Sequence, residues 1–101
     1  MAIQIGKYNF HGPFITADNL LDQSGVYTIL GRSAEHENWS VLDVGESEAV
    51  RTRVAAHDRA ECWKRRGHRT LAAAALYVPE RQRMTIEQEL RAAYNPPCGA
   101  R

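Results

Sequence analysis

The chain has 101 residues, of which 44% are hydrophobic and 25% are charged, and its formal net charge is +1. This length predicts one domain with a modest hydrophobic core, and the composition is that of an ordinary globular protein. No apolar run is long enough to cross a membrane and the N-terminus has no signal-peptide pattern, so we expect a cytoplasmic protein.

The first half of the chain has the patterns of β-strands. Alternating isoleucines within residues 1–9 predict an edge strand, and residues 11–13 predict a turn. Residues 26–30 are rich in β-branched and aromatic side chains, and residues 39–44 form a second strand pattern. The polar connection at residues 31–38 is too short for a crossover helix, so we expect these two strands to pair antiparallel.

The second half alternates helix and strand. Ser47 is a suitable N-cap for a helix that runs to about Lys64, and residues 71–78 predict a third strand. A capping box that begins at Thr85 predicts a second helix, which two prolines end at residue 96. This order predicts an α/β (α+β) fold, with a small central antiparallel β-sheet of about three strands flanked by α-helices.

A basic segment extends from residue 51 to residue 70. It holds seven Lys and Arg residues and two acidic residues, which gives it a local net charge of +5. Such a segment is typical of a surface that binds nucleic-acid phosphates, and it is equally typical of a solvated helix face. The candidate nucleic-acid-binding residues are Arg51, Arg59, Lys64, Arg65, Arg66 and Arg69.

The two cysteines, Cys62 and Cys98, are too few for a disulfide framework, and their spacing matches no zinc module. We therefore expect free thiols, mostly buried.

Within the basic segment, Arg53 and His57 are four residues apart, so they share one face of the predicted helix. An arginine offers a planar fork of donors and a histidine moves protons near neutral pH, which together suit a phosphate ligand.

Several residues together resemble the GIY-YIG nuclease superfamily. Gly25-Val26-Tyr27 and Asp43-Val44-Gly45, on successive predicted strands, are similar to the two signature tripeptides of the family. The family places an arginine eight residues after the second tripeptide and a histidine four residues later, as Arg53 and His57 stand here. Glu87, in a helix that ends at prolines, is similar to the glutamate near the family's C-terminus.

The resemblance covers residues 24–99 of a single predicted domain, residues 1–101. It implies a metal-dependent DNA endonuclease that hydrolyses phosphodiester bonds with Mg²⁺ or Mn²⁺. Carried over by position, Tyr27 orients or deprotonates the attacking water and Arg53 stabilises the phosphorane-like transition state. His57 is then an auxiliary acid or base, and Glu87 binds the metal ion.

The chain departs from the family pattern in three places. Asp43 replaces the second signature tyrosine, and an aspartate there is a general base, a second metal ligand or a mark of lost activity. Gly99 stands where the family often has an asparagine, and the connection between the tripeptides is longer than usual. The candidate catalytic residues are Tyr27, Asp43, Arg53, His57 and Glu87, and the candidate metal ligands are Glu87 and Asp43.

Each candidate residue also has a structural explanation. Tyr27 is a typical core aromatic residue, Arg53 can pair with Asp43 or Glu87, and His57 can be a capping or core histidine. The alternative function is therefore a catalytically degenerate domain that binds nucleic acid or another protein. For an enzyme of this size we expect little sequence specificity, with single-stranded or structured DNA as substrate or delivery by a partner.

Overall fold

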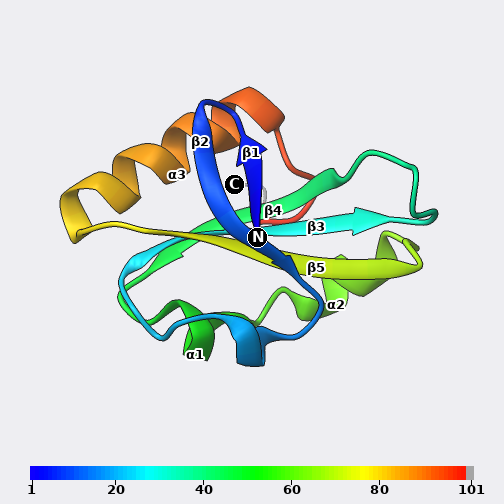
Figure 1. Cartoon of the computed structure of the whole chain (residues 1–101), viewed down its shortest axis with the longest axis horizontal. Coiled ribbons are helices and arrows are strands. Elements are labelled where there is room, and N and C mark those ends of the chain that lie inside the picture. The colour runs from blue at the N-terminus through cyan, green and yellow to red at the C-terminus, as the bar shows by residue number, and fades with distance from the viewer. Residues whose placement is uncertain (100–101) are drawn as a thin grey trace.

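Figure 1 shows a twisted β-sheet with α3 over one face and η1, α1 and α2 over the other. The computed structural model describes residues 1–99. The strands are β1 (Ala2–Ile5), β2 (Tyr8–Phe14), β3 (Gly25–Arg32), β4 (Ser40–Ser47) and β5 (Thr70–Tyr77). The helices are the 3₁₀-helix η1 (Ala17–Asn19) and the α-helices α1 (Val50–Ala55), α2 (Ala60–Arg65) and α3 (Glu80–Tyr94).

The sheet has five strands in the order β1-β2-β5-β3-β4, and every neighbouring pair is antiparallel. The prediction of about three strands is therefore wrong, although the α+β class is confirmed. The two additional strands form an N-terminal hairpin, because residues 11–13 lie within β2 instead of forming a turn. The register of β2 against β5 shifts between His11 and Phe14, so Pro13, which has no N–H, falls in an irregular part of the ladder.

The predicted antiparallel pairing of β3 with β4 is confirmed. Ile29 lies opposite Asp43, whereas Leu30 lies opposite Val41, so Leu42 is the extra residue of a β-bulge. Leu42 packs in the core beneath α1 and α2, and Asp43 hydrogen-bonds to side chains that come from the same side. The bulge therefore turns two consecutive residues of β4 toward these helices.

The predicted third strand is confirmed as β5, which lies in the sheet between β2 and β3. Its alanines favour a helix in isolation, but Ala72–Ala75 are buried in the centre of the sheet. Ala73 and Ala75 line the core beneath α1 and α2 with Tyr27 and Trp63, and Ala74 lines the core beneath α3 with Leu90. Pairing on both sides and burial on both faces override the helix preference of the sequence.

The single helix predicted from Ser47 to about Lys64 is wrong, because the chain forms two short helices with a break between Ala55 and Ala60. The break contains His57, whose side chain is buried against Tyr27. A continuous helix would carry His57 past this contact, so tertiary packing ends α1 early. Ser47 belongs to β4 instead of capping the helix.

α3 begins at Glu80, after Pro79, and not at the predicted capping box. The N–H groups of Gln82 and Arg83 donate to the carbonyl oxygen of Pro79, so the first turn is already formed there. The helix ends before Pro96, as the sequence predicts. Within residues 1–99, no helix is long and apolar enough to cross a membrane.

The expectation of free thiols is wrong, because Cys62 and Cys98 form a disulfide bond. The bond connects α2 to the segment that follows α3, across 36 positions of sequence. The N–H of Cys98 donates to the carbonyl oxygen of Leu42 at 3.0 Å, so this segment is attached to the outer edge of β4. Two cysteines that are distant in sequence give no signal of pairing until the fold brings them together.

Candidate functional site

The two tripeptides from the sequence lie side by side on β3 and β4. Tyr27 is directly opposite Gly45, and the tyrosine ring lies where a Cβ on Gly45 would be. Any larger residue at position 45 would collide with this ring. Gly45 therefore makes room for Tyr27, whose side chain is almost fully buried at 1% exposure.

Tyr27 and His57 form a buried pair. The Tyr27 Oη and His57 Nε2 atoms are 2.5 Å apart, and the two rings are nearly perpendicular. The backbone N–H of Arg59 donates to His57 Nδ1 at 3.0 Å, so the neutral ring carries its proton on Nε2 and donates it to Tyr27. The exposed Asp58 carboxylate is 3.2 Å from Nδ1 and would pair with the ring if the ring were protonated.

Burial controls the protonation of this pair. Burial, together with the nearby charges of Arg53 and Arg59, lowers the pKa of His57 to about 4. Burial raises the pKa of Tyr27 to about 12, against the opposing effect of the two arginines. Both side chains are therefore neutral at pH 7, so Tyr27 acts as a hydrogen-bonding hydroxyl and not as a phenolate.

Arg53 lies beside the Tyr27–His57 pair, at the end of α1. Its charge acts on both pKa values, and its Nη2 donates to Asp58 Oδ1 at 3.0 Å. The side chain of Asp58 is 74% exposed, so solvent screens this ion pair and weakens it. An anionic ligand can therefore replace Asp58 as the partner of this half-buried cation at little cost in free energy.

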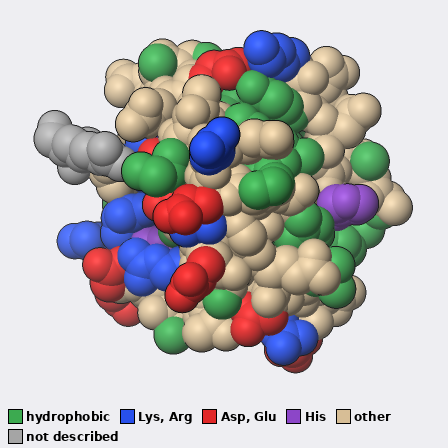
Figure 2. Space-filling view, turned by 90° about the vertical axis from the view of Figure 1, so that its left-hand side faces the viewer, with side chains coloured by type: hydrophobic (Ala, Val, Ile, Leu, Met, Phe, Trp, Pro, Cys, Tyr) green, Lys and Arg blue, Asp and Glu red, His purple; other side chains and the backbone are tan. Residues whose placement is uncertain are grey.

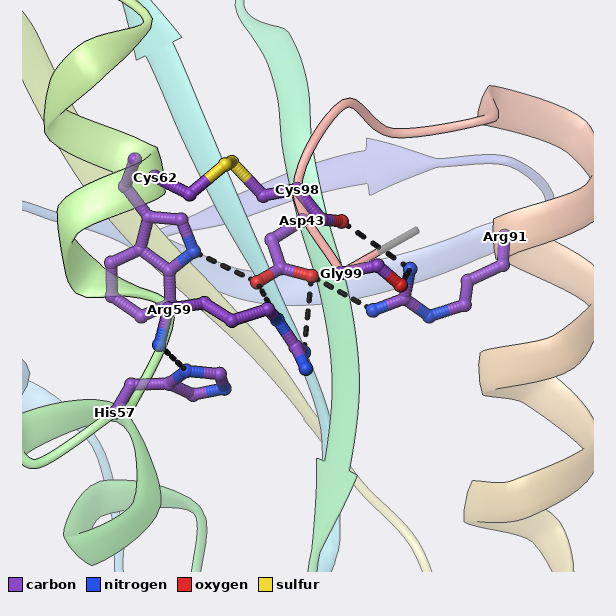
Figure 3. The surroundings of a disulfide bond; sticks show 8 residues. Asp43, His57, Arg59, Cys62, Arg91, Cys98 and Gly99 are labelled. Atoms are coloured by element: carbon purple, nitrogen blue, oxygen red, sulfur yellow. Dashed lines mark hydrogen bonds and ion pairs between the residues drawn. A yellow bond between two sulfur atoms is a disulfide. The ribbon is translucent and has the colours of Figure 1, made fainter. Parts of the chain in front are cut away.

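Asp43 is fully buried and accepts hydrogen bonds from three side chains, as Figure 3 shows for the two arginines. Arg59 donates from Nε (2.8 Å) and Nη2 (3.2 Å), and Arg91 donates from Nη2 (2.8 Å). The indole Nε1 of Trp63 donates at 2.8 Å. These four bonds occupy both carboxylate oxygens, which leaves Asp43 unsuited to bind a metal ion or to activate water.

Glu87 lies on α3, on the other side of Arg91 from Asp43. Its Oε2 is 3.3 Å from Arg91 Nε, and the residue is 9% exposed. The sequence suggests Arg53 as the cation between the two carboxylates, but the structure places Arg91 there. Arg91 also donates to the carbonyl oxygens of Val44 and Gly99, so it joins α3 to β4 and to the C-terminal segment.

The described residues hold no group of three or more His, Cys, Asp or Glu side chains that could bind a metal ion. A metal ion at this site would therefore rely on Glu87 as its protein carboxylate. This donor set fits Mg²⁺, which commonly keeps several water ligands and takes others from substrate phosphates. The predicted second ligand, Asp43, does not fit.

The candidate nucleic-acid-binding residues separate into two groups. Arg59 is half-buried at the site, whereas the remaining residues are exposed on α1, on α2 and before β5: Arg51, Lys64, Arg65, Arg66 and Arg69. Figure 2 shows one face of the molecule, on which basic and acidic side chains gather together at one side. Much of the remaining surface in that view is hydrophobic or uncharged.

Sequence reasoning did not find the residues that surround Asp43. The sequence predicts that Arg59 is a nucleic-acid-binding residue of the basic segment, and it indicates no role at the site for Arg91 or Trp63. The i, i+4 spacing of Glu87 and Arg91 is a signal that indicates an ion pair between them and so points to Arg91. Comparisons with protein-family models, with curated proteins and with solved structures returned no match for this chain.

Proposed function

We propose that this chain is a metal-dependent endonuclease that hydrolyses phosphodiester bonds in DNA, with a site similar to that of GIY-YIG nucleases. The observation that carries the proposal is the short contact between Tyr27 and His57 beside the Arg53 guanidinium. These three residues come from different parts of the chain and meet next to Gly45, while Glu87 on α3 is connected to the same strand through Arg91.

Tyr27 is assigned to the attacking water. Its oxygen accepts the hydrogen bond from His57 Nε2, so its own O–H remains to donate to a water molecule or a phosphate oxygen that reaches this buried position. Because its pKa is raised to about 12, the tyrosine keeps its proton at neutral pH. Its role is therefore to orient the water, and His57 fixes the direction of the hydroxyl group.

Arg53 is assigned to the scissile phosphate. Its guanidinium group is planar and permanently charged, and it can donate two parallel hydrogen bonds to phosphate oxygens. Negative charge grows on these oxygens as water adds to phosphorus, so a fixed cation lowers the barrier. The phosphate would displace the exposed Asp58 from Arg53, because it is the stronger ligand.

Glu87 is assigned to the metal ion, Mg²⁺ or Mn²⁺. When bound, such an ion polarises the phosphate and stabilises the charge on the leaving oxygen. Glu87 supplies a carboxylate in a nearly buried position, and its pairing with Arg91 limits the directions in which its oxygens point. We expect little sequence specificity, with single-stranded or structured DNA as substrate.

The cytoplasmic location stays a prediction. Disulfide bonds are typical of oxidising compartments, whereas the cytosol keeps most thiols reduced. The Cys62–Cys98 bond therefore makes the redox state of the isolated protein a quantity to measure before activity is assayed.

The test is cleavage of single- and double-stranded DNA and RNA with Mg²⁺, with Mn²⁺ and with a chelator. We expect metal-dependent cleavage of DNA, which Glu87→Gln abolishes because it removes the charge of the ligand. We expect Tyr27→Phe to reduce kcat by about 10²-fold, because the water loses its positioning group. Binding of DNA in the chelator should change little in either variant.

Two matched controls are available. Glu80→Gln removes an exposed carboxylate from the start of α3, and Tyr8→Phe removes an exposed hydroxyl from the N-terminal hairpin. Both should cleave like the wild-type protein. An absence of cleavage by the wild-type protein with every metal ion, or full cleavage by Glu87→Gln, would overturn the proposal.

The second candidate is a catalytically degenerate domain that binds nucleic acid or a protein partner. One observation favours it, namely that Arg91 binds both Asp43 and Glu87, which is also what a purely structural ion-pair network would show. Under this alternative, DNA would bind equally well with and without metal ions and would stay intact. The same cleavage experiment therefore separates the two functions.

A further inference from the structure

Arg59 is held in one orientation by a carboxylate that solvent cannot reach. Its Nε and Nη2 groups donate to the two oxygens of Asp43, and this carboxylate is completely buried. Arg91 and Trp63 hold Asp43 from other directions, so the carboxylate itself is fixed. Figure 3 shows Asp43 between the two arginines, with Arg59 on the side of His57.

The Arg59 side chain keeps unused donors. A guanidinium group has five N–H donors, of which Arg59 directs two toward Asp43. Within the described residues the remaining N–H groups make no hydrogen bond, and the side chain is 29% exposed. Arg91 differs, because it is only 14% exposed and also donates to Glu87 and to backbone carbonyl oxygens.

The position of Arg59 places these donors next to the Tyr27–His57 pair. Its backbone N–H binds His57 Nδ1, and its charge affects the pKa values of both His57 and Tyr27. Asp43 and Gly45 stand two residues apart on β4, and Gly45 is the residue opposite Tyr27. The guanidinium group therefore lies beside the reacting cluster.

We propose that Arg59 is a second phosphate-binding residue of this site and that Asp43 is its positioning residue. The proposal rests on the proposed function, and it names the ligand as a phosphodiester of the DNA backbone. Arg53, on α1, and Arg59, which immediately precedes α2, would contact the same phosphate. Asp43 then holds the Arg59 guanidinium group in position. It does not bind a metal ion or activate water.

Arg59→Gln tests the first part of the proposal. We expect kcat for DNA cleavage to fall by about 10²-fold and KM to rise by up to about tenfold, because the lost contact already binds the phosphate in the ground state and strengthens as charge develops on it. Arg59→Lys keeps the charge but lacks the planar guanidinium group, which can donate to both Asp43 and phosphate. Its kcat should therefore lie between those of wild type and Arg59→Gln.

Arg81→Gln is the matched control, because it removes one exposed arginine charge from the start of α3. It should leave kcat and KM unchanged. A thermal unfolding curve for each variant establishes that it is folded at the assay temperature. A kcat within about twofold of wild type for a folded Arg59→Gln would overturn the assignment.

The role of Asp43 is tested by a double-mutant cycle with Asp43→Asn and Arg59→Gln. If Asp43 acts through Arg59, Asp43→Asn lowers kcat in the wild-type background and has almost no further effect when Arg59 is already glutamine. Additive losses would mean that Asp43 supports the fold alone, and would overturn its positioning role. If Asp43→Asn does not fold, Asp43→Glu keeps the charge but displaces the guanidinium group, and it serves in the same cycle.

A metal-free measurement separates this proposal from the nuclease proposal. Affinity for a single-stranded DNA oligonucleotide is measured in chelator, with wild type, Arg59→Gln and Arg81→Gln. We expect about tenfold weaker binding for Arg59→Gln alone, the size of one charge-assisted hydrogen bond. If the wild-type protein cleaves nothing, the nuclease proposal fails, and this affinity difference still decides whether Arg59 binds phosphate.

Discussion

Asp43 and His57 are polar side chains that the fold buries almost completely, and each is stabilised by specific partners. A buried carboxylate is tolerated only when charged or hydrogen-bonding groups surround it, and Asp43 has two arginines and an indole N–H. Removing one partner of a buried ion pair commonly costs about 3–5 kcal/mol. Asp43 therefore contributes to the integrity of the site whether or not the site is catalytic.

The pKa of His57 predicts a loss of stability in acid. The pKa is about 4 in the folded protein and has an ordinary value of 6.5, so between these values the unfolded chain binds a proton that the folded chain excludes. The stabilisation is complete above about pH 6.5 and is lost as the pH falls toward 4. We expect a loss on the order of 2 kcal/mol, since solvent screens part of the effect.

The measurement is the free energy of unfolding in urea at pH 7 and at pH 4. His57→Gln should remove most of the difference between the two pH values, and His36→Gln, which changes an exposed histidine, should not. If the free energy of unfolding changes equally with pH in wild type and in His57→Gln, another group causes the loss of stability in acid.

At the level of elements, three irregular features assemble the candidate site. The bulge in β4 turns Asp43 toward α2, the break between α1 and α2 brings His57 to Tyr27, and the segment after α3 runs along β4. The first two features interrupt a regular element, and they place Asp43 and His57, whereas Tyr27, Arg53 and Glu87 lie within regular elements.

Reduction of the disulfide should destabilise the protein. The bond closes a loop of 36 residues, and in the chain-entropy model this stabilises the folded state by about 4 kcal/mol. We expect the midpoint of urea unfolding to fall when a reductant is added. The double variant Cys62→Ala/Cys98→Ala should match the reduced protein and should not respond to reductant. An unchanged midpoint for the wild-type protein in reductant would contradict this prediction.

At the level of the whole molecule, the candidate site and the exposed basic residues lie at different positions along the sheet. Arg69 immediately precedes β5, whose first residue pairs with Arg32 on β3. Tyr27 is five positions from Arg32 on the same strand, which corresponds to roughly 17 Å. This is the rise of about five base pairs of duplex DNA, so one DNA segment can reach both regions.

If these basic residues bind phosphates, affinity for DNA should fall steeply with salt. We expect the variant Lys64→Gln/Arg65→Gln/Arg66→Gln to reduce the slope of log affinity against log salt by up to about 3, because each contact releases about one counterion. Arg81→Gln should leave the slope unchanged. Binding that does not depend on salt, or no binding at low salt, would mean that this surface is only solvated.

The local features of this fold follow from the amino-acid sequence alone. Alternation and turn residues predicted the β3–β4 pair, β5 and the end of α3, because these features depend on neighbouring residues. The spacing of the motif also selected Tyr27 and His57, which the structure brings together. The N-terminal hairpin was only partly visible, since a glycine and a proline within β2 have the pattern of a turn.

The pairing of the charged and sulfur-containing side chains depends instead on contacts between residues that are distant in sequence. Asp43 forms ion pairs with Arg59 and Arg91, and Cys62 forms a disulfide bond with Cys98. These partners are too far apart in sequence for a local pattern to predict their pairing. The break in the helix at His57 has the same origin, because burial of one side chain outweighed the continuity of the helix. Local preferences amount to a few tenths of a kcal/mol per residue, whereas burying a charge without a partner costs several kcal/mol, so the long-range contacts prevailed.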